Sequence, residues 1–142
     1  MKTYSIIVLT FLLSYTSIFG QTLKKEASKS QVYVGEEFYY IITIENVSNL
    51  SDLYRIEDNL GSDIDLLGVE FSPAMQLMTN WGYCSSITYT PTTPQNNAGN
   101  FVLNFNTCSG SSTALNTISF KLKVRFNNGA CVKNTHQNTA EL

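Results

Sequence analysis

Three cysteines give this sequence its clearest chemical potential. Cys84 and Cys108 lie in two stretches of alternating residues, and the turn-forming segment between them centres on Asn96 and Asn97. A hairpin centred there places the two cysteines directly opposite each other, at a Cα separation that a disulfide spans. Both would project from one face, opposite to that of four apolar residues: Ile87, Tyr89, Leu103 and Phe105. We therefore predict a Cys84–Cys108 disulfide.

Cys131 is left over by this pairing. It is then either a small buried residue or the partner of a cysteine in another chain. Pairing of Cys131 with Cys84 or with Cys108 stays open at the level of sequence.

A group of acidic residues after residue 56 could hold a cation. The oxygen ligands that calcium prefers are available from Glu57, Asp58, Asn59, Asp63 and Asp65, and calcium often rigidifies loops. We single out Asp58, Asp63 and Asp65 as candidate calcium ligands. Because the spacing does not fit the helix-loop-helix calcium pattern, we favour the interpretation that these are solvated turn residues.

Aromatic rings are the third candidate site. Trp81 and Tyr83, in the segment NWGYC, could stack on a sugar ring or anchor a protein partner. Tyr39 and Ile41 place apolar surface on the outward side of an alternating stretch. In the structural alternative, Trp81 caps the open end of the core and Tyr39 packs under a neighbouring loop or domain.

Catalytic patterns are weak in this sequence. The single histidine, His136, lies in the polar segment NTHQNT, and a Cys–His pair would need an orienting group and an oxyanion site as well. The acids gather in one segment and do not form a pair across a cleft. No Cys or His spacing is typical of zinc. We expect no enzyme and no cofactor other than the calcium considered above.

Two long alternating stretches must organise the core. Residues 34–46 (VGEEFYYIITIEN) place four apolar side chains on one side: Phe38, Tyr40, Ile42 and Ile44. Residues 118–126 (ISFKLKVRF) do the same with five: Ile118, Phe120, Leu122, Val124 and Phe126. The outward cations of the second stretch, Lys121, Lys123 and Arg125, are typical of a solvated face that discourages edge-to-edge pairing.

The remaining elements also have strand character. Val, Ile, Thr, Tyr and Phe are abundant, turn residues separate the apolar runs, and no long apolar stretch has helical spacing. Further strands are expected at residues 31–34, 53–57, 64–71 and 130–142, and residues 72–110 are expected to contain only the hairpin. The sequence predicts an all-β, immunoglobulin-like antiparallel β-sandwich of about seven to eight strands.

The N-terminal residues 1–20 have the pattern of a signal peptide: Lys2, an apolar run over residues 6–13, and a more polar exit ending at Gly20. The apolar run is too short to anchor the chain in a membrane. Residues 21–30 are expected to form a polar lead-in or an edge strand, and residues 31–142 the sandwich domain. The net charge of −2 is scattered, which argues against nucleic-acid binding.

Several segments resemble the conserved repeat domain of bacterial surface proteins, a domain of unknown function. They are VGEEFYYIITIEN, the strand ending in acidic residues at 54–58, and the terminal NTHQNTAEL. The resemblance covers residues 31–70 and 116–142. The usual Pro is missing, since Gly61 follows Leu60, and one copy is present where the family usually repeats. The resemblance implies an immunoglobulin-like sandwich in a secreted or wall-associated chain.

Together these patterns favour a secreted or cell-surface module that is structural or adhesive and not catalytic. Its partners would be neighbouring surface domains or an extracellular protein or glycan. The alternative is a small carbohydrate- or protein-binding module whose site contains Trp81 and Tyr83.

Overall fold

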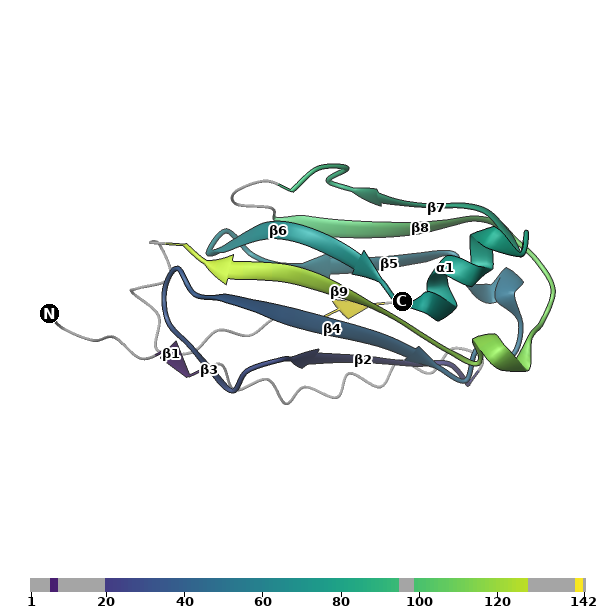
Figure 1. Ribbon diagram of the computed structural model, residues 1–142, viewed down its shortest axis with the longest axis horizontal. Coiled ribbons are helices and arrows are strands. Elements are labelled where there is room, and N and C mark those ends of the chain that lie inside the picture. The colour runs from purple at the N-terminus through teal and green to yellow at the C-terminus, as the bar shows by residue number, and fades with distance from the viewer. Residues whose placement is uncertain (1–5, 8–19, 95–98, 128–139, 142) are drawn as a thin grey trace, which may run out of the picture.

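Two four-stranded antiparallel sheets pack around one hydrophobic core (Figure 1). The computed structural model describes residues 6–7, 20–94, 99–127 and 140–141. In spatial order the first sheet contains β2 (Thr22–Ala27), β4 (Glu37–Glu45), β9 (Thr117–Phe126) and β6 (Ile64–Phe71). The second contains β10 (Ala140–Glu141), β5 (Arg55–Asn59), β8 (Asn100–Cys108) and β7 (Cys84–Thr90). The prediction of an all-β sandwich of seven to eight strands is confirmed.

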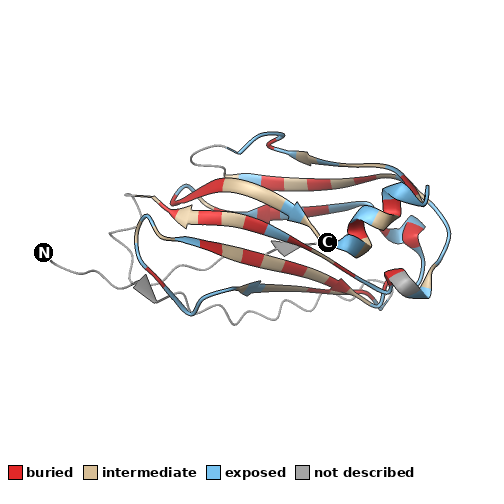
Figure 2. Cartoon of the chain, in the orientation of Figure 1, coloured by how far each residue is buried: buried red, intermediate tan, exposed pale blue. Residues whose placement is uncertain are grey.

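Strands β4 and β9 form the centre of the first sheet. They pair antiparallel over their whole length, with Tyr40 opposite Leu122. Every side chain that the alternation places inward on these two strands is buried, as the regular red bands in Figure 2 show. The two-residue period of a strand therefore determines which face is packed.

Residues 22–27 form the edge strand β2, so the second alternative for residues 21–30 is correct. This strand pairs with β4, and it places Leu23 opposite Ile44 and Lys25 opposite Ile42. Leu23 and Lys25 therefore lie on the inward face of the sheet. A lysine at that position needs a partner inside the sandwich, because burying an unpaired charge is costly.

The hairpin β7–β8 has the predicted register. Cys84 lies opposite Cys108 and Ile87 opposite Phe105. The predicted turn residues Asn96 and Asn97 lie outside the described residues. The sequence places both cysteines on the face opposite to that of the apolar residues of the hairpin, but Cys84 is buried in the core together with Leu103 and Phe105. Helix α1 packs against β7, and the left-handed Thr107 (φ 47°) interrupts the alternation of β8 beside Cys108.

Helix α1 (Pro73–Asn80) is the element that the sequence prediction missed. Ser72 caps its N-terminus, Pro73 occupies the first turn, and Met75 and Met78 are buried, three residues apart on one face. The sequence Ser72–Pro73, a capping residue followed by proline, is typical of the start of a helix. Two short 3₁₀ helices lie in connections between strands: η1 (Leu50–Asp52) between β4 and β5, and η2 (Thr113–Leu115) between β8 and β9.

The two-residue strands β1 (Ile6–Ile7) and β3 (Gln31–Val32) pair with each other. The rest of the predicted signal peptide before Gly20, most of the predicted strand 130–142, Cys131 and His136 lie outside the described residues. Within the described part of the chain, no helix has the length and apolar character needed to cross a membrane.

Candidate functional site

The candidate aromatic site lies where α1 ends and the chain enters β7. Trp81 is the C-cap residue of the helix, and 56% of its surface is exposed. Its ring meets that of Tyr83 edge to face, with centroids 6.2 Å apart. Trp81 therefore does not cap the core, contrary to the structural alternative. An exposed indole beside a second ring is a surface on which an apolar ligand face could stack.

Tyr83 is held more firmly than Trp81. It is half-buried against the core, and its carbonyl accepts a hydrogen bond of 2.9 Å from the backbone N–H of Ser109. Gly110 lies against its ring, since a Cβ built there would be 3.4 Å from Tyr83 Cδ1. The pair thus combines a fixed ring with an exposed one.

Tyr39 has a different set of neighbours and does not join these rings. It projects from the outer face of β4, where its hydroxyl donates to Glu70 at 3.2 Å. Lys121 Nζ lies 5.7 Å from the centre of its ring. Tyr39 therefore packs among charged side chains of its own sheet and not under a loop, and the three aromatic candidates do not form one site.

Ion pairs cover the outer face of the first sheet. Lys123 Nζ lies 2.6 Å from Glu37, and Arg125 Nε lies 3.1 Å from Asp65. The hydrogen bond from Lys123 lowers the pKa of Glu37, and Glu37 in turn raises the pKa of Lys123. Because β9 lies between β4 and β6, the prediction that its cations protect a sheet edge is wrong.

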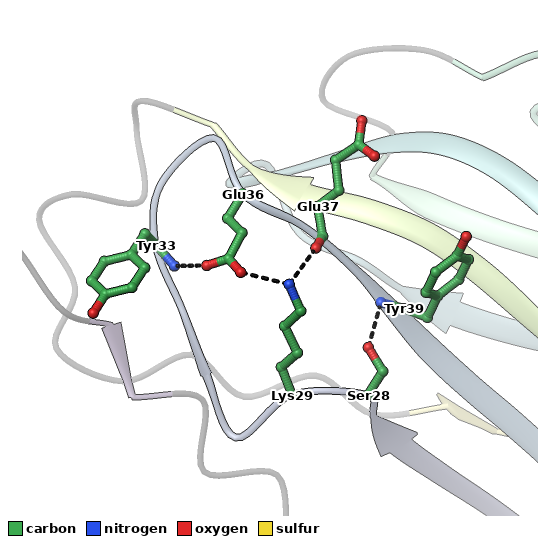
Figure 3. Close-up of polar contacts among 6 residues, drawn as sticks. All are labelled: Ser28, Lys29, Tyr33, Glu36, Glu37 and Tyr39. Carbon is green, nitrogen blue, oxygen red and sulfur yellow. Dashed lines mark hydrogen bonds and ion pairs between the residues drawn. The ribbon is translucent and has the colours of Figure 1, made fainter.

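The connection from β2 to β4 is fixed by polar contacts (Figure 3). Lys29 Nζ donates to Glu36 and to the carbonyl of Glu37, and the backbone N–H of Tyr33 donates to Glu36. These contacts lower the pKa of Glu36, with the Lys29 hydrogen bond as the largest cause. Gly35 makes the turn with a φ of 82°, a conformation that glycine adopts without steric cost.

The acidic candidates are not solvated turn residues, and this prediction is corrected. Asp58, Asp63 and Asp65 are all buried. β5 extends two residues beyond the predicted strand 53–57 and so includes Asp58, and Asp65 lies in β6, which has the predicted range 64–71. Asp65 pairs with Arg125, and the carbonyl of Asp63 accepts from the backbone N–H of Asn127. Among the described residues, no group of three or more His, Cys, Asp or Glu side chains is placed to hold a metal ion.

Asp58 instead has a partner that the sequence analysis did not identify. Lys25 Nζ lies 2.6 Å from Asp58 Oδ1 and 2.6 Å from Oδ2. The two side chains are 5% and 0% exposed. The ring of Tyr40 lies 4.3 Å from the same nitrogen. This contact joins β2 of one sheet to β5 of the other, inside the sandwich.

A sequence signal for this pair existed on both strands. Leu23, Lys25 and Ala27 alternate toward one face, and so do Ile56, Asp58 and Leu60. In each set of three, the middle residue is charged, and the two charges are opposite. Because a buried charge needs a partner, this pattern favours a contact between the two residues in the core. Burial lowers the pKa of Lys25 to about 8, a shift that Asp58 partly offsets. Burial also raises the pKa of Asp58, against the opposing effect of Lys25.

The predicted disulfide is present, and it closes the far end of the hairpin. Cys84 and Cys108 are bonded with an S–S distance of 2.06 Å. A comparison of the chain with protein-family models, with curated proteins and with solved structures finds no match.

Proposed function

We propose that the protein is an exported structural or adhesive module of the bacterial cell surface or secretome, and that it catalyses no reaction. The observation that carries the proposal is the Cys84–Cys108 disulfide, because such bonds persist in oxidising compartments outside the cytosol. The resemblance to the conserved repeat domain of bacterial surface proteins supports the same compartment. The disulfide and the buried Lys25–Asp58 contact together favour a rigid block that presents or spaces other surface parts.

Export can be tested on the full chain in a bacterial host. We expect a processed chain that starts close to Gln21 in the medium or envelope, with Cys84 and Cys108 oxidised. Cell fractionation followed by non-reducing mass spectrometry reports the N-terminus and the thiol state together. A chain that stays in the cytoplasm with its full N-terminus would contradict the proposal.

The adhesive role needs a separate measurement. A surface-displayed chain should increase attachment to neighbouring cells or to an extracellular matrix, and it should do so without turning over any component. Cells that display a chain of the same fold with Lys25→Met and Asp58→Leu test whether rigidity matters. Equal attachment with and without the displayed protein would count against adhesion.

A second candidate is a carbohydrate- or protein-binding module. The exposure of Trp81 beside Tyr83 favours it, since exposed aromatic side chains often anchor ligands. Glycan-array and pull-down measurements should compare the natural chain with Trp81→Ala. Tyr54→Ala is the matched control, because Tyr54 is also an exposed aromatic residue. Binding that Trp81→Ala removes and Tyr54→Ala preserves would favour this candidate over a purely structural module.

A further inference from the structure

The contact between Lys25 and Asp58 has a geometry that suits more than an ion pair. Nζ is 2.6 Å from each carboxylate oxygen, so it lies symmetrically opposite Cγ. Cγ is the atom that an amine attacks when it forms an amide. The two strands hold both side chains in this arrangement, since β2 is paired with β4 and β5 with β8.

Burial distinguishes this pair from a neighbouring one. Lys24 and Glu45, which also join β2 to another strand, are 2.8 Å apart, but their side chains are 38% and 34% exposed. Lys25 and Asp58 are almost completely enclosed. Two charges in such a place lose their hydration, and their mutual attraction often fails to repay that loss. An uncharged product would remove this cost.

The enclosure also favours the reactive protonation states. An amine attacks only when it is neutral, and a carboxyl group loses water only when it is protonated. Burial lowers the pKa of Lys25 and raises the pKa of Asp58, so both shifts are toward the neutral pair. Proton transfer from Nζ to Asp58 within the contact produces that pair without exchange with solvent.

We propose that Lys25 and Asp58 condense to an isopeptide bond that covalently joins the two sheets. The lone pair of Nζ forms a C–N bond with Cγ, and one C–O bond of the carboxyl group breaks. The departing hydroxyl takes a proton from Nζ and leaves as water, so an amine and a carboxylic acid become an amide and one water molecule. No oxidant, reductant or activated donor is needed. Holding the two groups in contact replaces a bimolecular reaction, with effective molarities of about 10⁵ M or more in well-oriented cases.

The bond would fix the edge strand β2 to the rest of the fold. β2 is an edge strand, and strands at an edge are the ones that detach first. An amide between Lys25 and Asp58 would close a loop of chain between residues 33 positions apart. β2 could then not separate from β5 under denaturant or force. The proposed isopeptide bond goes beyond a structural or adhesive role and does not depend on that role.

Intact-mass spectrometry of the full chain tests the proposal directly. After reduction and alkylation of the cysteines, the mass should be lower by one water molecule than the mass calculated from the observed N-terminus. Trypsin should fail to cleave after Lys25, and fragmentation should identify a branched peptide that contains Lys25 and Asp58. The natural chain with its full calculated mass would overturn the proposal, and so would a branch from Lys25 to any other residue.

Three variants assign the bond. Lys25→Arg and Asp58→Ala should each restore the missing water completely. Lys24→Arg is the matched control, because Lys24 lies on the same strand in an exposed ion pair, and the mass deficit should persist in this variant. A deficit that survives Lys25→Arg would overturn the assignment. Because the natural chain alone decides whether the bond exists, poor folding of a variant does not affect that result.

Discussion

Lys25 in β2 and Asp58 in β5 meet inside the sandwich, with Nζ 2.6 Å from both carboxylate oxygens, although the two strands belong to different sheets. β2 is an edge strand of the first sheet, and β5 is an interior strand of the second. The contact therefore joins the two sheets at the edge where β2 pairs with β4.

The first prediction concerns the two partners in chains that cannot form an amide. Asp58→Ala leaves Lys25 buried without its acid, which destabilises proteins by about 3–5 kcal/mol. The double variant Lys25→Met, Asp58→Leu replaces both charges by apolar groups, which is often neutral. We expect the double variant to be more stable than Asp58→Ala in urea unfolding. The reverse order would show that the two side chains are not coupled.

The second prediction is the pH dependence of amide formation. The reactive state has a neutral amine and a protonated carboxyl group, so the Lys25–Asp58 pair must carry one titratable proton in total. The rate of amide formation should therefore be flat between the folded pKa values of the two groups. Above about pH 8 Lys25 is neutral but Asp58 is a carboxylate, and below the raised pKa of Asp58 the amine is protonated. The rate should fall on both sides, giving a bell-shaped profile.

This profile can be followed by mass spectrometry. A chain purified in denaturant before it has folded is diluted into buffers of different pH, and the loss of water is measured over time. A rate that keeps rising between pH 8 and pH 10 would contradict the need for a protonated carboxyl group.

The third prediction concerns the hairpin disulfide. Cys84 and Cys108 are 24 residues apart, and bonds that close loops of this size typically contribute about 2–4 kcal/mol. Changing both cysteines to serine should lower the free energy of unfolding by that amount. The β-sheet signal in circular dichroism should persist at low temperature, because pairs such as Ile87 with Phe105 still hold the register. Unchanged thermal unfolding would be the contrary result.

The fourth prediction concerns the start of helix α1. Ser72 Oγ accepts a hydrogen bond from the backbone N–H of Met75 at 3.3 Å and one from that of Ser119 at 3.4 Å. Ser72→Ala removes the acceptor of both hydrogen bonds, and loss of such a cap costs about 1 kcal/mol. Ser112 is the matched control, because it precedes η2 without a side-chain capping bond. Chemical denaturation should show a loss for Ser72→Ala and a much smaller one for Ser112→Ala.

Much of the framework was predictable because it depends on local periodicity. The alternation in residues 37–45 and 117–126 correctly identified the buried face of both central strands. The hairpin register, and with it the Cys84–Cys108 pair, followed from the position of one turn between two alternating stretches. Such patterns are read along one strand or across one hairpin, so no distant contact is needed to interpret them.

Other features depended on contacts between residues far apart in the chain. The sequence alone left Asp58 as a turn acid and placed Lys25 in a polar lead-in or edge strand, since neither residue shows which strand of the other sheet faces it. The central position of β9 was equally hidden, because strand order depends on which non-local pairings form. Alternation thus determined the inward side of each strand, and the stacking of the two sheets decided that Lys25 and Asp58 meet there.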